Sequence, residues 1–130
     1  MSGINKVILV GHLGKDPQLR YLEDNVPVAS FPLATSEFIT KNGTKEEQTE
    51  WHNIVMWRSL AEAAAKVLRK GRLIYLEGKC RTRSFEDKNG VKRYTTEIMT
   101  DSFTMLGRSS DFDEESLAVK FSAGQQQDRG

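Results

Sequence analysis

Apolar and polar residues alternate along most of the chain in short runs, the spacing expected of half-buried β-strands. Residues 4–13 hold a β-branched apolar run that ends at Gly14, and residues 26–38 predict a longer strand. Pro32 lies inside the longer strand and predicts a bulge or an edge there, because proline cannot donate a ladder hydrogen bond. The same reasoning predicts strands over residues 20–23, 49–57, 73–82 and 93–106.

Two asparagine–glycine pairs, at residues 42–43 and 89–90, predict hairpin turns, because both residue types tolerate positive φ angles. One helix is predicted, over residues 60–70, where apolar residues recur at helical spacing. Ser59 and Glu62 have the spacing of a capping box, in which two side chains satisfy backbone donors at the start of a helix. A glycine follows this range as a left-handed terminator.

The order of these elements is strands, one short helix, then strands. A single helix among about five twisted strands is typical of a small closed barrel, because closure leaves no exposed edge strand. If residues 20–38 form one interrupted second strand, the helix lies between the third and fourth strands, as in an OB-type barrel. We therefore expect an all-β, five-stranded OB-fold barrel with one short α-helix.

The end of the chain has a different composition. An acidic segment and a glutamine-rich terminus hold too few apolar groups to offset the entropy lost on ordering. We expect an OB-fold domain over residues 1–107 and a short, flexible, mildly acidic tail over residues 108–130. Alternating apolar residues inside that tail leave a short added strand, or a docked segment, as the alternative: Leu117, Val119 and Phe121.

The net charge of +1 conceals an uneven distribution. Residues 79–93 carry six lysines and arginines against Glu86 and Asp87, and a polyanion senses such a local patch rather than the total. The single cysteine, Cys80, excludes an intrachain disulfide and is typical of a reducing compartment. The N-terminus lacks the pattern of a signal peptide, and no apolar run approaches the roughly 18 residues that span a bilayer. We expect a cytoplasmic protein outside the membrane.

Aromatic and cationic side chains share two of the predicted strands. Successive side chains of a strand point to opposite faces, so Trp51 and Trp57 lie on one face of theirs. The residues that lie together on a face of the other strand are Lys79, Arg81, Arg83 and Phe85. Flat rings combined with positive charge suit single-stranded nucleic acid, whose bases stack on aromatic side chains. The alternative is that the tryptophans are core residues and the arginines ordinary solvated surface.

The sequence shows no catalytic or metal-binding pattern. His12 and His52 have no cysteine or histidine at metal-ligand spacing, and we interpret His52 as a hydrogen-bonding residue of the sheet. Carboxylates are scattered rather than paired. We therefore expect no enzyme activity, no metal and no cofactor. Two other classes remain as alternatives: a protein-interaction barrel with little affinity for DNA, and a nuclease, which would need a metal site.

Short motifs follow one another in order between residue 3 and Gly107. They are Asn5–Gly11, Asp16–Pro17, Arg20–Tyr21, Leu33–Glu37, Gln48–His52, Leu60–Glu62, Leu68–Gly71, Glu77–Gly78, Arg81–Arg83 and Arg93–Glu97. In combination they resemble the bacterial single-stranded DNA-binding protein family. The resemblance implies an OB fold, a homotetramer, sequence-independent binding of single-stranded DNA, and roles in DNA replication, recombination and repair.

The family's base-stacking aromatics map onto Trp51, Trp57 and Phe85. A fourth stacking position, typically tryptophan in the family, is Ile39 here. Phe38 is next to it but points to the other face of a regular strand. The candidates for contacts with backbone phosphates are the basic residues Lys6, Arg20, Lys79, Arg81, Arg83, Lys92 and Arg93.

The last residues depart from the family pattern. Family members usually carry a long linker rich in Gly, Pro and Gln, with an acidic tip that recruits replication and repair proteins. Here the sequence ends in Asp128-Arg129-Gly130, so the usual tip is absent and the resemblance does not extend to that recruitment. The expected partners are single-stranded DNA and further copies of the chain, and replication and repair proteins stay open as additional partners.

Overall fold

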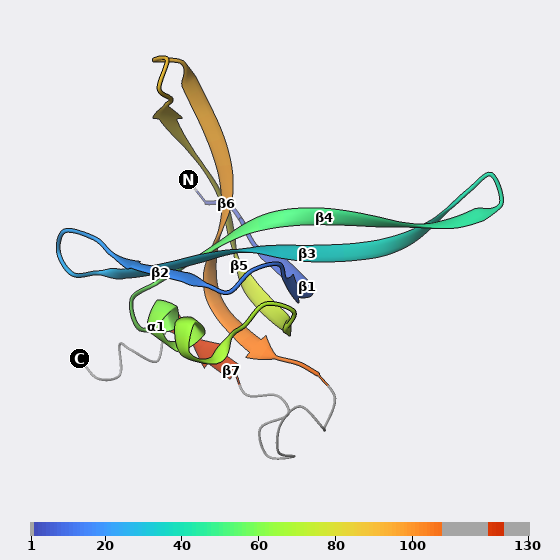
Figure 1. Cartoon of the computed structure of the whole chain (residues 1–130), viewed down its shortest axis with the longest axis horizontal. Helices are drawn as coiled ribbons and strands as arrows, with labels where there is room; N and C mark the ends of the chain where they lie inside the picture. Colours follow the sequence, from blue (N-terminus) through green and yellow to red (C-terminus); the bar gives the residue numbers. More distant parts are fainter. Residues whose placement is uncertain (1, 108–119, 124–130) are drawn as a thin grey trace.

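The computed structural model describes residues 2–107 and 120–123, which form seven strands and one helix (Figure 1). In chain order these are β1 (Val7–Leu13), β2 (Gln18–Tyr21), β3 (Pro27–Lys41), β4 (Thr44–Trp57), α1 (Arg58–Val67), β5 (Leu73–Glu86), β6 (Lys92–Met105) and β7 (Lys120–Ser122). Five strands close a ring in the order β1-β5-β6-β4-β3, and β3 pairs with β1 to complete it. The expected five-stranded OB-fold barrel is confirmed.

Alternate residues of the barrel strands fill its interior. Leu33, Ile54, Ile74, Leu76 and Phe103 have no exposed surface. Burial of each such side chain stabilises the fold by about 1.5–3 kcal/mol. A shift of one residue in any strand would move these side chains to the solvent face, so the core sets the register of the whole sheet. The register in turn decides which residues share the outer face.

Residues 20–38 do not form one interrupted strand, and this expectation was wrong. β2 is a separate strand that pairs antiparallel with the first part of β3, from Gln18 opposite Ser30 to Tyr21 opposite Pro27. The chain reverses at Asn25, which has a φ of 61°. Asparagine tolerates this left-handed conformation, so a polar segment that resembled a mere interruption is a hairpin turn. The helix still follows the third strand of the ring, β4, and precedes the fourth, β5.

Pro32 lies at an edge rather than a bulge. The pairing of β3 with β4 runs through Pro32, opposite Asn53, without a shift. The carbonyl of Pro32 accepts a hydrogen bond from the Gly14 N–H. In an extended strand the N–H and C=O of one residue point to the same side, so the missing donor faces the gap between β2 and β1. Because no ladder hydrogen bond is formed across that gap, a proline is tolerated there.

The helix begins two residues earlier than the capping box predicts. Trp57 is the N-cap, with extended φ and ψ of −124° and 150°, and no side chain caps it. Because β4 leads straight into α1, Ser59 is already inside the helix and the capping-box prediction was wrong. Leu60, Ala61 and Ala64 are buried against the barrel at helical spacing. Among the described residues, no helix is long and apolar enough to cross a membrane.

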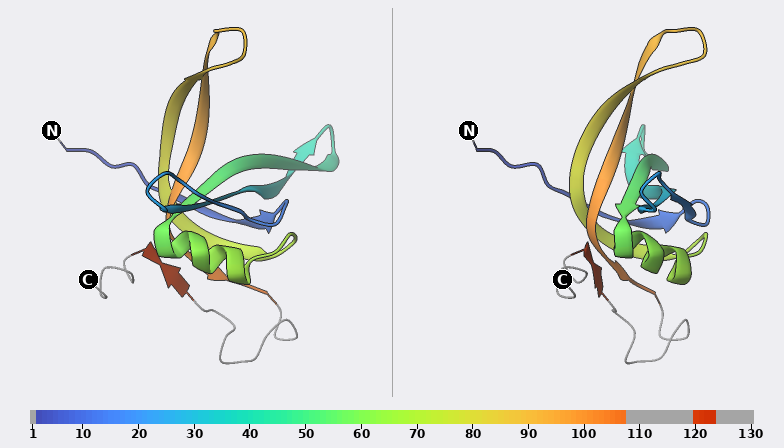
Figure 2. Two further views of the ribbon diagram at one scale, coloured as in Figure 1. Left: turned by 60° about the vertical axis from the view of Figure 1, so that its left-hand side comes forward. Right: turned by 90° about the vertical axis from the view of Figure 1, so that its left-hand side faces the viewer.

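Two hairpin arms extend from the barrel in different directions, one made of β3 and β4 and the other of β5 and β6 (Figures 1 and 2). The first arm turns at Asn42 and Gly43, which have φ angles of 52° and 77° as a two-residue type I′ hairpin requires. At the second tip Gly90 has a φ of 77°. Both predicted turns are confirmed.

β7 adds a short antiparallel strand to β6, with Phe121 opposite Phe103. The rings of these two residues stack with centroids 4.8 Å apart. Residues 120–123 thus follow the alternative of an added strand rather than the expected disordered tail. An isolated sequence cannot show that Phe103 has an apolar surface left for Phe121. The other residues of the predicted tail, including Leu117 and Val119, lie outside the described residues.

Candidate nucleic-acid interface

The pairing register of β4, β5 and β6 places the two predicted faces on the same side of the sheet. Residues directly opposite each other in a sheet share a face. Val55 of β4 pairs with Met99 of β6, and Lys79 of β5 pairs with the same Met99 from the other side. Trp51 and Trp57 lie on the Val55 face of β4 because they are even numbers of residues away. The residues of β5 and β6 that continue this outer face along the arm are Arg81, Arg83, Phe85, Arg93 and Glu97.

An open groove of about 460 Å³ runs across this outer face. It is lined by Arg20, Leu22, Val28, Ser30, Val55, Trp57, Arg81, Arg83, Glu97 and Met99. A second hollow, of about 280 Å³, shares Ser30, Val55 and Glu97 with the first and extends to Pro32 and Asn53. Trp51 is the next residue of β4 on the same face. The outer face therefore offers a continuous hollowed path from Trp57 toward Trp51.

The three predicted stacking residues are all accessible. Trp51 is 59% exposed, Trp57 37% and Phe85 44%. The Trp51 ring lies against Gly14, where a Cβ atom would come within 2.5 Å of its Cζ3 and 3.3 Å of Pro32 Cγ. One side of the indole is thus supported by the protein while more than half of the residue stays in solvent. This arrangement suits a rigid stacking surface, and the alternative of fully buried tryptophans is wrong.

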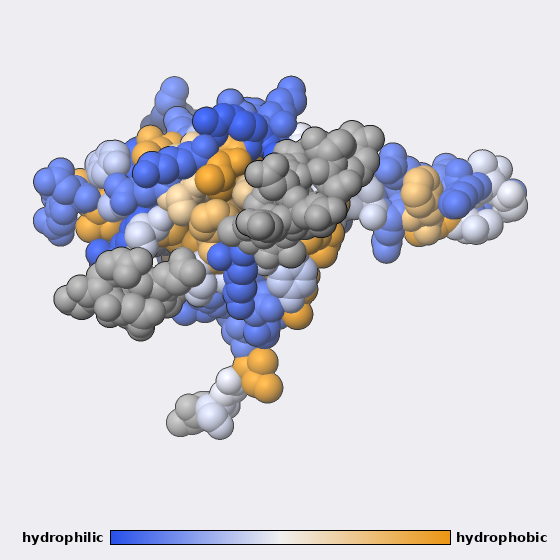
Figure 3. Space-filling model, turned by 90° about the horizontal axis from the view of Figure 1, so that it is seen from below, coloured by the Kyte–Doolittle hydropathy of each residue, from blue (hydrophilic) through white to orange (hydrophobic). Residues whose placement is uncertain are grey.

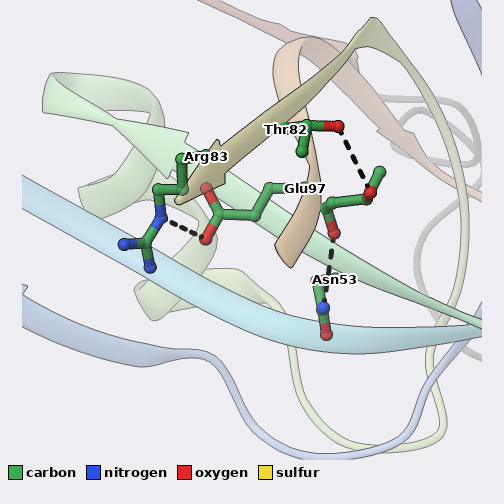
Figure 4. Close-up of polar contacts among 5 residues, drawn as sticks. Asn53, Thr82, Arg83 and Glu97 are labelled. Atoms are coloured by element: carbon green, nitrogen blue, oxygen red, sulfur yellow. Dashed lines mark hydrogen bonds and ion pairs between the residues drawn. The ribbon is translucent and has the colours of Figure 1, made fainter. Parts of the chain in front are cut away.

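Two arginines of the outer face are already paired with carboxylates. Arg83 donates through Nε to Glu97 Oε2 at 3.2 Å (Figure 4), and Arg93 donates through Nε to Asp87 Oδ2 at 2.9 Å. Across residues 2–107 and 120–123, Arg20, Lys79 and Arg81 have no ion pair. No carboxylate of the described residues therefore holds any of these three in an ion pair, although Glu97 is opposite Arg81 in the sheet.

Asp87 holds the tip of the β5–β6 arm. Its carboxylate accepts hydrogen bonds from Arg93 and from the backbone N–H groups of Asn89 and Val91. The bond from Arg93, and then those from the backbone, lower the pKa of Asp87 below its ordinary value. Asp87 thus fixes the turn that positions Phe85 and Arg93 across the arm from each other.

Lys6 lies away from the groove. Its Nζ is 3.0 Å from Glu77, which also accepts a hydrogen bond from the Tyr75 hydroxyl at 2.7 Å. These bonds lower the pKa of Glu77, and the bond to Glu77 raises the pKa of Lys6. The neighbouring Asn5 exchanges two hydrogen bonds with the backbone of Cys80, which fastens the start of the chain to the base of the arm.

Lys92 is also separated from the other predicted cations. It is opposite Glu86, and its Nζ lies 5.8 Å from the centre of the Tyr94 ring. Lys92 and Tyr94 share the reverse face of the arm, because they alternate with Arg93 and Thr95. This alternation is visible in the sequence, but the prediction that Lys92 contacts phosphate rested on its charge alone.

Three exposed aromatics were absent from the predicted site: Tyr21, Phe38 and Tyr94. The sequence signal for Phe38 was that it lies on the same face of the hairpin as Trp51. Recognising this requires the position of the turn, which sets the register between the two strands. His52 has the role that was expected, since its Nε2 lies 2.9 Å from Thr35 Oγ1 within the sheet. Among the described residues no three His, Cys, Asp or Glu side chains are grouped so as to hold a metal ion.

The comparisons with known proteins point the same way. The model of the "Single-strand binding protein family" matches residues 4–106. A protein named single-stranded DNA-binding protein 1 from Xylella fastidiosa is 45% identical over 113 residues, which covers 85% of this chain and 83% of that protein. The single-stranded DNA-binding proteins of two Neisseria meningitidis strains are 47% identical over 105 residues. The match spans 80% of this chain and 60% of the length of the Neisseria proteins.

A solved structure has the same fold. In the Plasmodium falciparum SSB complex with ssDNA, the protein chain matches this one with a TM-score of 0.76 and 31% identity. The similarity covers 82% of this chain and 98% of that one. Because the family model matches nearly the whole barrel and its arms, the chain belongs to the single-strand binding protein family.

Proposed function

We propose that this chain binds single-stranded DNA without sequence preference, by stacking bases on Trp51, Trp57 and Phe85 and by contacts of phosphates with basic side chains. The observation that carries this proposal is the groove in which Trp57 meets Arg20 and Arg81 from separate strands. Stacking is sequence-tolerant because every base has a flat face, and each stacked base contributes about 1–3 kcal/mol. The named function of the Xylella and Neisseria relatives supports the same conclusion.

Not all predicted cations contribute equally in this proposal. Arg20, Lys79 and Arg81 contact phosphates directly, since no ion pair within the described residues holds them. Arg83 and Arg93 must leave their carboxylate partners before they can contact a phosphate. This reduces their net contribution to the free energy of DNA binding. Lys6 and Lys92 lie off the groove and contact DNA only where the strand continues around the barrel or over the arm.

We further propose that the chain assembles as a homotetramer. Along its length β1 pairs with β5 on one side, whereas within the described residues its other edge pairs with β3 only at His12 and Leu13. Ile8 and Val10 are exposed on this strand. An exposed edge strand with apolar side chains favours pairing with another chain, and a second copy supplies an identical edge. Ile8→Lys should lower the mass measured by light scattering.

The biological setting proposed here is protection of single strands during DNA replication, recombination and repair in the cytoplasm, with no enzyme activity. Such a role needs binding that tolerates every sequence, and stacking on aromatic side chains has this property. The family to which the chain belongs supports this setting.

The decisive experiment is a titration of intrinsic tryptophan fluorescence with oligo(dT) and with a mixed-sequence strand at several salt concentrations. Binding should quench fluorescence with both strands, because both tryptophans lie on the proposed face. Trp57→Ala should weaken both by about 1–3 kcal/mol. Co-migration of DNA with the protein while fluorescence stays constant would refute the stacking residues. A lack of DNA binding would favour a protein-interaction barrel.

A further inference from the structure

The ring of Trp51 points from β4 toward β1. Its atoms Cζ3 and Cη2, at the far end of the indole, are the ones that a Cβ atom on Gly14 would meet. Gly14 directly follows β1, and its N–H donates to the carbonyl of Pro32 in β3 at 2.8 Å. The Trp51 ring therefore reaches across β3 to the end of β1.

His12 lies on the same outer face, two residues before Gly14. It is opposite Ala34 in the sheet, and Ala34 is opposite Trp51 on its other side. Because residues opposite each other share a face, these three side chains form one row across β1, β3 and β4. His12 is exposed, and the alanine between the two rings is small. The backbones of His12 and Trp51 are two strand spacings apart, which is about 10 Å.

A single strand that leaves Trp51 has two directions in which to continue: outward along the β3–β4 arm, or across β3 to β1. Viewed from below, the arm has a mostly hydrophilic surface (Figure 3). Residues 35–50, which form most of this arm, carry four glutamates against two lysines. Because carboxylates repel phosphates, charge favours the direction across β3, toward His12.

The side chains around His12 on the outer face of β3, β4 and β5 carry no charge at neutral pH. They are Pro32, Ala34, Ser36, Trp51, Leu73 and Tyr75. The one titratable group among them is the Tyr75 hydroxyl, which donates to Glu77 at 2.7 Å. This bond raises the pKa of Tyr75 above its ordinary value, so Tyr75 stays neutral wherever a histidine titrates.

The charged groups next to this surface do not pair with His12. Lys15 and Arg72 adjoin it in the chain, and both are basic. Asp16 accepts a hydrogen bond from the Lys70 backbone N–H at 2.8 Å. Within residues 2–107 and 120–123, His12 forms no ion pair. A proton on its ring would therefore add a positive charge that a phosphate can meet.

We propose that His12 is a further contact for single-stranded DNA, beyond Trp51 and across β3, and that protonation of its ring makes DNA binding depend on pH near neutrality. This inference rests on the proposed function and adds a residue, a direction and a regulation to it. Imidazole is the side chain that ordinarily changes its charge between pH 5 and 8. When charged it contacts a phosphate, and when neutral it offers only hydrogen bonds.

The test titrates wild type, His12→Asn and His12→Lys with oligo(dT) at about pH 5.5 and about pH 7.5, over a range of salt concentrations. Oligo(dT) is the probe because thymine has no group that titrates between these values. Wild type should bind about two- to fivefold more tightly at the lower pH. Its slope of log K against log salt should be steeper there by about 0.7, which corresponds to one more neutralised phosphate.

The two variants separate charge from hydrogen bonding. Asparagine forms hydrogen bonds but takes up no proton, so His12→Asn should bind with the same affinity and salt slope at both pH values. Lysine is charged throughout this range, so His12→Lys should bind at both pH values as wild type does at the lower one.

His52 is the matched control, because the chain has two histidines and the ring of His52 is held by Thr35 within the sheet. His52→Asn should keep the pH dependence of wild type. NMR reports on both rings without substitution. With oligo(dT) bound, the midpoint of the His12 titration should move to higher pH by about 0.3 to 0.7, since a ligand that prefers the protonated form favours protonation by the same factor. The His52 signal should not move.

The outcomes distinguish this contact from the proposed function. If wild type binds DNA with the same affinity and salt slope at both pH values, or if His12→Asn keeps the pH dependence, the contact is wrong and the proposed function stands. If wild type binds no DNA at either pH, both fail. Circular dichroism of each variant at both pH values verifies that the barrel is folded.

Discussion

The contact between Gly14 and Trp51 allows a test of whether the position of a stacking ring matters for DNA binding. Gly14→Ala adds one methyl group behind the indole, 2.5 Å from Cζ3 and 2.9 Å from Cη2. Ordinary contact begins near 3.4 Å, so the ring must retreat by about 0.9 Å. Pro32, 3.3 Å from the new atom, limits relaxation on the other side. The backbone of Gly14 is not in the left-handed region, so alanine introduces no φ strain there.

The expected cost follows from the side-chain torsions. Holding a side chain about 30° from its preferred rotamer costs about 0.5–1.5 kcal/mol. If bound DNA requires the original ring position, Gly14→Ala should weaken oligo(dT) binding by about 1 kcal/mol, or about fivefold. Removal of the ring in Trp51→Ala sets the upper limit, at about 1–3 kcal/mol. The barrel should remain folded, because the clashing atoms lie at the end of a side chain.

The assay is the fluorescence titration, combined with thermal denaturation of each variant. Gly3→Ala is the matched control for DNA binding, since a Cβ there has no neighbour within 4 Å. Gly11→Ala is the control for stability, since its Cβ would meet the backbone carbonyl of Ala34, which cannot move aside. Gly11→Ala should therefore lower the melting temperature, while Gly14→Ala should chiefly lower DNA affinity.

A double-mutant cycle tests whether Gly14→Ala weakens DNA binding through the Trp51 ring. In a Trp51→Ala background Gly14→Ala should have no further effect on affinity, because the clash needs the ring. Equal loss in both backgrounds would show that Gly14 acts by another route. If Gly14→Ala has wild-type affinity and unchanged tryptophan emission, the idea that Gly14 supports Trp51 as a stacking surface is refuted.

Three further predictions follow from the cations, the added strand and the turn. Arg81→Ala should reduce the slope of log K against log salt by about 0.7, and Arg83→Ala by less, because Glu97 already compensates Arg83; equal slopes would contradict this difference. Phe121→Ala should lower stability by about 1–2 kcal/mol in denaturant unfolding, through lost stacking on Phe103, with Lys120→Ala as a neutral control. The pKa of Asp87 is lowered in the folded state, so its stabilisation of the arm tip is complete above the ordinary pKa and is lost as pH falls through the folded value. The NMR signals of the Asn89 and Val91 amides should titrate below the ordinary pKa of an aspartate side chain, and titration at or above that pKa would contradict this.

The sequence by itself determined what depends on near neighbours in the chain. Alternation along β4 and β5 placed Trp51 with Trp57, and Lys79 with Arg81, on common faces, because the side-chain period of a strand is local. The turn at Asn42-Gly43 was also predictable, because positive φ angles are a property of those two residue types. The motif series identified the family before any geometry was known.

The tertiary structure alone decided how those faces meet. The groove exists because burial of Ile54, Ile74 and Phe103 sets β4, β6 and β5 in one register, which no single strand encodes. Long-range packing likewise decided that Glu97 compensates Arg83 and that Phe121 covers Phe103. Phe38 shows the same limit, since its face is that of Trp51 only through the pairing of β3 with β4. Contacts between residues far apart in the chain depend on how the whole core packs, and the local pattern of apolar and polar residues does not determine that packing.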